Sequence, residues 1–276
     1  MKMKKILSMF AVLMTSAALI TGCGGDDGGS ANKPAESKTL KVGASPVPHS
    51  EILEQIRPAL KDEGINLEIV EFSDYVQPNI ALNDKELDAN FFQHEPYLND
   101  FIKEHTEMKL TNAGGIHIEP MGIYSKKVTD LKELMDGASI AIPNDPTNGG
   151  RALMLLEKAG LIKLRDGVKE TATVQDVVEN PLNIMFQEVE AAQLPRTLED
   201  VDAAVINTNY AMQINLVPTK DALFMEDSTS PYVNIVAVRV GDENRPEIQA
   251  LMKALKSDAV KKFINEKYNG AIVPAF

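Results

Sequence analysis

The stretch SIAIPNDPTNGGRALMLLEKAG, residues 139–160, contains a short apolar run, a polar loop with two glycines, and a second apolar segment that ends at Gly160. We predict a strand over 139–144 and a helix over 149–160, because apolar residues recur at helical spacing after the loop and a glycine closes the segment. A strand that passes through a short loop into a helix is the repeating unit of α/β proteins. The stretch therefore predicts an α/β fold around it.

The same alternation of strands and helices continues along the chain. We predict strands over 39–45, 65–72, 87–92, 182–189, the start of 201–214, and 232–240, and an extended segment over 116–125. Helices are predicted over 49–64, 95–105, 130–137, 194–200 and the end of 201–214, with a short helix inside 74–86 and one or two helices over 245–268. This order favours α/β layers with largely parallel sheets. Ligands of such sheets bind beyond the carboxyl ends of the strands. Since several predicted strands end in polar loops, a ligand cleft is favoured over a purely structural role.

The beginning of the chain is predicted to be a targeting segment and a tether. A lysine-rich start, an apolar run over 6–20 and small residues before Cys23 indicate a secretory signal peptide over 1–22. The run is shorter than the about 20 apolar residues that span a membrane. The sequence Ile-Thr-Gly-Cys at its end resembles a bacterial lipobox, so we interpret Cys23 as lipidated rather than as a leftover thiol. Residues 23–38 then form the lipidated cysteine and a flexible tether.

Composition argues against several classes of protein. The formal net charge of −12 argues against nucleic-acid binding and against adhesion to anionic lipid through basic patches. The four histidines lack the H-x-x-x-H type of metal-ligand spacing, and there is no G-x-S-x-G motif. We therefore predict no metal, no cofactor and no catalysis.

Arg151 is the first candidate binding residue. The first turn of a helix has unpaired N–H groups and a partial positive charge, so helix starts bind anions. The glycines before Arg151 would let a ligand approach the backbone, and a guanidinium holds a carboxylate through two parallel hydrogen bonds. Residue type alone slightly favours the alternative, a surface arginine beside a turn.

A second candidate cluster lies in ANFFQHEPY, residues 89–97. The aromatic residues can belong to the core, with His94 capping a helix. Alternatively, His94 and Tyr97 are three residues apart and can face one pocket, whose aromatic walls would suit an apolar or thioether group. Asn207 and Asn234 end or interrupt apolar strands, where an unsatisfied amide costs about 1–3 kcal/mol. Each is therefore satisfied either by a neighbouring loop or by a ligand.

Long motifs in a fixed order carry a resemblance to a known family. EFSDYVQPNIAL, DANFFQHEPYL, IPNDPTNGGRALMLLEKAGLIKL, QLPRTLED, AVINTNYA and SPYVN resemble the methionine-binding lipoproteins of bacterial ABC importers, the MetQ/NlpA family. The likeness runs from the lipobox to the C-terminus. It implies a type II periplasmic-binding-protein fold, in which two α/β lobes are joined by two crossover segments. Lobe 1 would comprise 39–118 and 232–276, and lobe 2 would comprise 119–231.

The resemblance also implies a function. The protein would be anchored by lipid on the extracytoplasmic side of the cell membrane, capture L-methionine and deliver it to the permease of an ABC importer. D-methionine or a methionine-containing dipeptide is an alternative ligand. Less favoured alternatives are a periplasmic enzyme with His94 as its base and a surface lipoprotein that binds a partner.

The positions that match the family's ligand contacts are Tyr75, Phe92, His94, Tyr97, Arg151, Asn207 and Asn234. By this resemblance Arg151 would pair with the ligand's carboxylate, and the asparagines would bind its α-amino and carboxylate groups. The remaining four would supply an aromatic wall and polar contacts. The segment IHIEPMG, residues 116–122, departs from many relatives, and near the cleft it would shift ligand preference.

Overall fold

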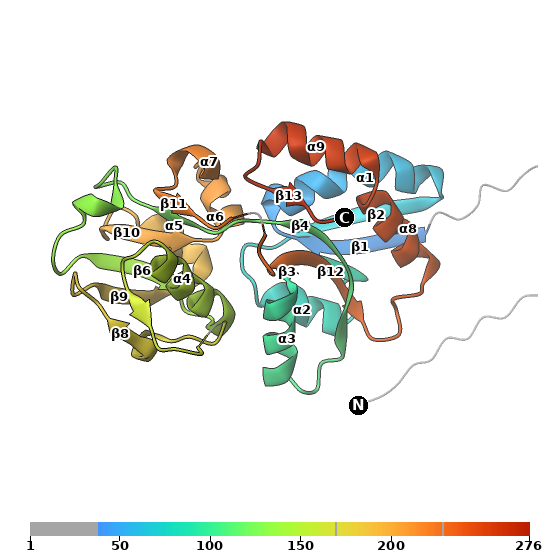
Figure 1. Cartoon of the computed structure of the whole chain (residues 1–276). Coiled ribbons are helices and arrows are strands. Elements are labelled where there is room, and N and C mark those ends of the chain that lie inside the picture. Colours follow the sequence, from blue (N-terminus) through green and yellow to red (C-terminus); the bar gives the residue numbers. More distant parts are fainter. Residues whose placement is uncertain (1–37, 169, 228) are drawn as a thin grey trace, which may run out of the picture. The chain divides into compact units, whose positions relative to one another are not determined.

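The structure is a computed structural model that describes residues 38–168, 170–227 and 229–276 (Figure 1). These residues belong to one compact unit. The predicted signal peptide, Cys23 and the tether up to residue 37 lie outside the described residues. No helix in the described part of the chain has the length and apolar character needed to cross a membrane.

The first sheet has six strands in the order β13–β4–β12–β3–β1–β2. Its strands are β1 (Lys38–Ala44), β2 (Ile65–Glu71), β3 (Ala89–His94), β4 (Leu110–Ile118), β12 (Val233–Arg239) and β13 (Val273–Pro274). β1 pairs in parallel with β2 and β3, whereas β12 runs antiparallel to β3 and β4. β13 pairs antiparallel with β4.

Helices cover both faces of this sheet (Figure 1). They are α1 (Glu51–Asp62), α2 (Gln77–Asn83), α3 (Glu95–Glu104), α8 (Pro246–Leu255) and α9 (Asp258–Tyr268), and the turn η1 (Pro46–Ser50) precedes α1. Val236 and Val238 of β12 pack with the apolar residues of α1, α8 and α9, whereas Ile235 and Ala237 pack with those of α2 and α3. This division follows from the strand geometry, because successive side chains point to opposite faces.

The second sheet has five strands in the order β11–β5–β10–β6–β9. Its strands are β5 (Gly122–Tyr124), β6 (Ser139–Pro143), β9 (Met185–Val189), β10 (Ala203–Ile206) and β11 (Phe224–Met225). The helices of this part are α4 (Pro146–Lys158), α5 (Leu194–Thr197), α6 (Thr208–Gln213) and α7 (Pro218–Asp221), with short turns η2 (Leu131–Glu133), η3 (Val174–Asp176) and η4 (Ala191–Gln193). A separate hairpin pairs β7 (Lys163–Leu164) with β8 (Val177–Glu179).

The prediction of largely parallel sheets is wrong, because both sheets are mixed. Each has a parallel core, β2–β1–β3 in the first sheet and β9–β6–β10 in the second. The antiparallel strands are added where the chain passes between the sheets. β4 leads the chain out of the first sheet toward β5, and β12 brings it back beside β4 (Figure 1). Two neighbouring strands that carry the chain in opposite senses must pair antiparallel.

Two predicted helices differ from the structure. The predicted helix over 130–137 is only the short turn η2, since Met135 is exposed and Gly137 adopts a positive φ of 79°. The helix predicted over 149–160 begins earlier, at Pro146.

The sheets show how the chain is divided. The first sheet uses strands from Lys38 to Ile118 and from Val233 to Pro274, whereas the second uses strands from Gly122 to Met225. The chain therefore crosses between the sheets twice. The predicted arrangement of two α/β lobes joined by two crossover segments is confirmed.

Candidate functional site

A cavity of about 330 Å³, including its mouth, is lined by residues from both lobes. Its lining comprises Tyr75, Phe92, Gln93, His94, Tyr97, Glu119, Asn148, Arg151, Asn207, Thr208, Asn209 and Asn234. All seven predicted site residues lie in this lining. The lining combines charged, amide and aromatic side chains, which is the composition of a small-molecule site.

The reasons that the sequence offered for Arg151 are wrong, although Arg151 does line the cavity. Because α4 begins at Pro146, Arg151 lies in its second turn and not at its start. The helix start is already capped by Asp145, whose carboxylate accepts a hydrogen bond of 2.9 Å from the backbone N–H of Asn148. The unpaired N–H groups of this helix therefore do not form an open anion site.

The two glycines before Arg151 also serve the protein's own packing and not a ligand. A Cβ at Gly149 would lie 2.9 Å from the carbonyl oxygen of Pro143, and a Cβ at Gly150 would lie 2.4 Å from that of Glu170. Such contacts are shorter than van der Waals separation, so α4 can approach these backbone segments only with glycine at both positions.

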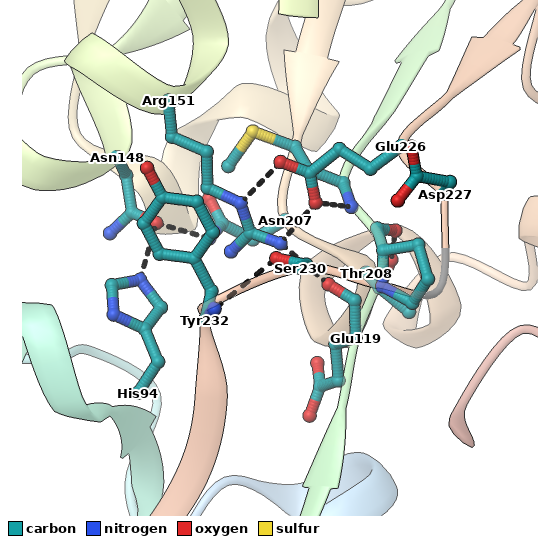
Figure 2. Close-up of polar contacts among 12 residues, drawn as sticks. His94, Glu119, Asn148, Arg151, Asn207, Thr208, Glu226, Asp227, Ser230 and Tyr232 are labelled. Atoms are coloured by element: carbon teal, nitrogen blue, oxygen red, sulfur yellow. Dashed lines mark hydrogen bonds and ion pairs between the residues drawn. The ribbon is translucent and has the colours of Figure 1, made fainter. Parts of the chain in front are cut away.

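The guanidinium of Arg151 is buried and has a counter-ion within the chain (Figure 2). Nε donates to Oε1 of Glu226 at 2.8 Å, and Nη2 donates to Oε2 of the same residue at 2.5 Å. Nη2 also donates to the backbone carbonyl of Glu119 at 2.7 Å. The ring centroid of Tyr232 lies 4.2 Å from Cζ. Among the described residues Nη1 has no hydrogen-bond partner, so its N–H groups can serve a carboxylate ligand.

His94 has both ring nitrogens engaged. Its Nδ1 caps α3 by accepting from the backbone N–H of Tyr97 at 3.1 Å. Nε2 therefore carries the proton and donates to Oδ1 of Asn148 at 3.1 Å, and Asn207 Nδ2 donates to the same oxygen at 2.8 Å (Figure 2). Burial, with a smaller contribution from Arg151, lowers the pKa of His94 to about 3. A neutral imidazole whose lone pair is already used does not suit the role of a catalytic base.

Three rings form an aromatic wall in the cavity. The ring centroid of Tyr75 lies 5.9 Å from that of Phe92 and 5.7 Å from that of Tyr97. The hydroxyl of Tyr75 donates to Oδ1 of Asn209 at 2.5 Å, and the hydroxyl of Tyr97 donates to the carbonyl of Tyr75 at 3.1 Å. Burial raises the pKa of the Tyr75 phenol well above its ordinary value. The wall is therefore uncharged and presents ring surface to a ligand.

Sequence reasoning missed several lining residues, of which Glu119 is the most important. Glu119 directly follows β4 in the segment 116–122, which the sequence marked as a departure from many relatives. Its Oε1 lies 2.7 Å from Nε2 of His117 and 3.2 Å from Nε2 of His49. Burial raises the pKa of Glu119, and its electrostatic interactions with His49 and Arg151 oppose that shift. In the sequence, Glu119 is the only acidic residue of the segment 116–122. An isolated acid in such a segment was the signal that could have marked it as a site residue.

Two further asparagines were also missed as site residues. Asn148 and Asn209 stand within the motifs IPNDPTNGGRALMLLEKAGLIKL and AVINTNYA, so the motifs that marked Arg151 and Asn207 also contained these two residues. Nδ2 of Asn209 and Oδ1 of Asn207 are buried and lack a partner among the described residues. An unsatisfied buried polar atom costs about 1–3 kcal/mol, so both atoms indicate a place for a polar ligand group.

One side-chain cluster has donors that suit a divalent cation. The ligand atoms of His49, His117 and Glu119 lie within 4.8 Å of one another. The imidazole Nε2 atoms, however, already lie at hydrogen-bond distance from the carboxylate. Both Nδ1 atoms lack a partner among the described residues, whereas a metal-bound histidine usually bonds through its other nitrogen. Hydrogen bonding therefore accounts for the cluster, and the absence of a metal stays a prediction.

Comparison with known proteins identifies the family. A model of the NlpA lipoprotein family matches residues 40–276. The methionine-binding lipoprotein MetQ of Bacillus subtilis is 44% identical over 276 residues, which is 99% of each chain. The D-methionine-binding lipoprotein MetQ of Escherichia coli K12 is 43% identical over 272 residues, or 98% of this chain and 97% of that one.

A similar structure is known. A nutrient binding protein from Burkholderia cenocepacia, solved with bound methionine, superposes with a TM-score of 0.83 and 49% identity, covering 86% of this chain and 100% of that one. This similarity confirms the fold that the sequence predicted. The chain belongs to the NlpA lipoprotein family.

Proposed function

We propose that this protein captures methionine in the cavity between its lobes and delivers it to the permease of an ABC importer. The observation that carries the proposal is the arrangement of charge around the cavity. One cationic edge, one buried carboxylate and one aromatic wall face the same small space. These are the three features that a zwitterionic amino acid with an apolar side chain requires.

The ligand's carboxylate is assigned to Arg151. Arg151 lines the cavity, and its Nη1 has no partner among the described residues, while Nε and Nη2 are held by other residues of the chain. Asn234 lies close by on β12, and its Oδ1 is 3.0 Å from Nε2 of His49. That contact leaves the amide Nδ2 of Asn234 as a second donor for the carboxylate.

The ligand's ammonium is assigned to Glu119 and Asn207. The carboxylate of Glu119 supplies the opposite charge, and the unpartnered Oδ1 of Asn207 supplies an acceptor. A buried carboxylate without a counter-ion is costly, so a ligand ammonium would stabilise Glu119 as it binds. The thioether chain would then lie against Tyr75, Phe92 and Tyr97, because sulfur contacts ring edges favourably.

Binding is the activity proposed, without catalysis, metal or cofactor. The competing role of His94 as a base is disfavoured by its hydrogen bonds to Tyr97 and Asn148. The relatives named as binding lipoproteins support the same conclusion.

The proposed location is the extracytoplasmic face of the cell membrane. The signal peptide 1–22 would be removed, and Cys23 would carry the lipid. A tether up to residue 38 would then lead to lobe 1 (39–118 and 232–276) and lobe 2 (119–231). The relatives' description as lipoproteins supports the anchor.

Calorimetric titration of L-methionine tests the proposed function. The protein should begin at Thr39 and be unfolded and refolded first, so that bound ligand is removed. We expect binding with one ligand per chain, and a ligand at 100 times its Kd would stabilise the fold by about 2.7 kcal/mol. D-methionine and glycyl-methionine are titrated as competing candidates. If either binds more tightly than L-methionine, that ligand becomes the proposed substrate. Absence of heat and of thermal stabilisation with all three would overturn the proposal.

A further inference from the structure

Glu226 does not line the cavity, yet it holds the residue assigned to the ligand's carboxylate. It directly follows β11, at the start of the second crossover segment, and its side chain is 14% exposed. Its two carboxylate oxygens accept from Nε and Nη2 of Arg151 at 2.8 and 2.5 Å (Figure 2). Parallel hydrogen bonds of this kind fix the plane of a guanidinium as well as its position.

The same carboxylate is itself fixed by the first crossover segment. The backbone N–H of Met121 donates to Oε2 of Glu226 at 3.0 Å. In return, the backbone N–H of Glu226 donates to the carbonyl of Met121 at 2.9 Å. Glu226 therefore joins the two segments that connect the lobes, and Arg151 is attached at that junction.

Two more contacts of Arg151 come from the same segments. Nη2 donates to the carbonyl of Glu119 in the first crossover, and the ring of Tyr232, which directly precedes β12, lies over Cζ at 4.2 Å. The orientation of the guanidinium is thus set by Glu119, Glu226 and Tyr232. Within the described part of the chain, only Nη1 is left without a partner and remains for a ligand.

We propose that Glu226 is a positioning residue for recognition of the ligand's carboxylate, an inference that rests on the proposed function. Its first effect is geometric, because it holds Nε and Nη2 of Arg151 and leaves Nη1 as the group that can meet the ligand. Its second effect is electrostatic, because it compensates a buried positive charge before the ligand arrives. Without Glu226 the guanidinium is free to turn and is no longer aligned with the ligand's carboxylate.

The test compares two ligands that differ only at the carboxylate, L-methionine and L-methioninamide. Titrations at pH 6.5 keep both α-amino groups largely protonated, since an α-amino group beside an amide has an ordinary pKa of about 7.7–8.0 and the carboxylate of methionine raises it further. We expect Glu226→Ala to lower the ratio of the Kd for L-methioninamide to the Kd for L-methionine at least tenfold. The variant should lose affinity for methionine and hardly any for the amide. Asp227→Asn is the matched control. Asp227 is the next carboxylate in the chain and pairs with Lys158 on the surface. The ratio of the two dissociation constants in Asp227→Asn should therefore equal that of the wild type.

A merely structural role predicts a different result. Equal weakening of both ligands in Glu226→Ala, with the ratio unchanged, would overturn the proposal. If this variant does not fold, Glu226→Gln keeps the shape and removes the charge, and the same change in ratio is expected from it.

A second measurement needs no ligand. In the ligand-free protein labelled with ¹⁵N, the Nε–H resonance of Arg151, assigned through Arg151→Lys, should be protected from exchange. It should lose this protection in Glu226→Ala and keep it in Asp227→Asn. Protection that is unchanged in Glu226→Ala would show that Glu226 does not hold Arg151. Because this readout is independent of methionine binding, it separates failure of this inference from failure of the proposed function.

Discussion

Nε2 of His94 lies 3.1 Å from the side-chain oxygen of Asn148, so a residue at the end of β3 in one lobe meets a residue of α4 in the other. The hydroxyl of Tyr75 makes a second contact of this kind with Asn209. These residues line the cavity, and their contacts form only when the lobes approach each other. Enclosure of a ligand and contact between the lobes are therefore linked.

Removing the hydroxyl of Tyr75 should shorten the lifetime of the complex. Tyr75→Phe keeps the aromatic ring but deletes the hydrogen bond to Asn209 that joins the lobes. A net loss of about 1 kcal/mol corresponds to ~5-fold faster dissociation of L-methionine, with little change in association. Stopped-flow fluorescence or surface plasmon resonance measures both rates.

Tyr124→Phe is the control for this variant. Tyr124 is buried in the second lobe, and its hydroxyl has no partner among the described residues. L-methionine should therefore dissociate from Tyr124→Phe at the wild-type rate. If Tyr75→Phe also released ligand at the wild-type rate, the hydrogen bond between the lobes would not contribute to closure.

Truncation of Arg151 should remove most of the affinity. Arg151→Ala deletes the donor assigned to the ligand's carboxylate, and loss of one partner of a buried charge pair costs about 2–5 kcal/mol, or ~30- to 5,000-fold in Kd. It also strips Glu226 of its buried counter-ion, so a lower thermal midpoint is expected. Calorimetry and circular dichroism separate the two effects. Wild-type affinity in a folded Arg151→Ala protein would disprove the assignment.

Asn234 should also matter for affinity. Asn234→Ala removes the amide donor proposed for the carboxylate and leaves His49 without one of its contacts. A cost of about 1–3 kcal/mol corresponds to a rise in Kd of roughly 5- to 150-fold. Asn83→Ala, which changes a half-buried asparagine of α2 that does not line the cavity, serves as the control in the same titration. A Kd equal to that of the control would make Asn234 a structural residue.

Stability of the ligand-free protein should fall as the pH is lowered from about 6.5 toward 4. Burial lowers the pKa of His49 to about 4 and those of His94 and His117 to about 3. Below their unfolded pKa of about 6.5 these histidines bind protons in the unfolded chain only, so each reduces the free energy of unfolding by up to about 1.4 kcal/mol per pH unit. Glu119 and Asp145 have raised pKa values and offset part of this loss.

Urea unfolding at pH 7, 6 and 5 measures this slope. His117→Asn should reduce the dependence of the free energy of unfolding on pH by the contribution of one titrating histidine. A free energy of unfolding that stays constant between pH 7 and 5 would contradict the assignment of these histidines as neutral in the folded state.

The anchor can be tested apart from binding. Cys23→Ala removes the thiol that would be lipidated, so the processed protein should appear in the aqueous phase after detergent partition instead of the detergent phase. Binding of L-methionine by the released protein should be unchanged, since the cavity lies wholly between residues 75 and 234. Retention in the detergent phase of a Cys23→Ala protein that has lost residues 1–22 would exclude a lipid at this position.

Local pattern was enough to predict much of the fold. The helix α1 has its apolar residues Ile52, Leu53, Ile56 and Leu60 on one buried face, and this spacing is visible in the sequence. β10 and β12 are apolar runs, and they are buried in the structure. β4 was placed too late in the chain, because the polar residues and glycines of its first half carry no strand pattern. Its pairing with β12 is what makes that half a strand.

The candidate site could be predicted only in part. Long motifs marked seven residues that line one cavity, but they did not mark Glu119, whose importance arises from the approach of His49 and His117 to its carboxylate. Nor did they reveal Glu226, which is 75 residues from Arg151 in the chain. Hydrogen bonds between such distant residues leave no periodic trace in a sequence.

The sequence by itself determined the α/β class and marked seven of the residues that line the cavity, and it predicts the signal and lipobox, because these depend on local composition, spacing and motif. The tertiary structure decided the mixed pairing of the sheets, the capping of α4 by Asp145 and the direction in which Arg151 presents its free N–H groups. Each of these depends on which distant segments meet. An arginine in a motif can bind any anion, and here the carboxylate of Glu226 decides which side of Arg151 remains for the ligand.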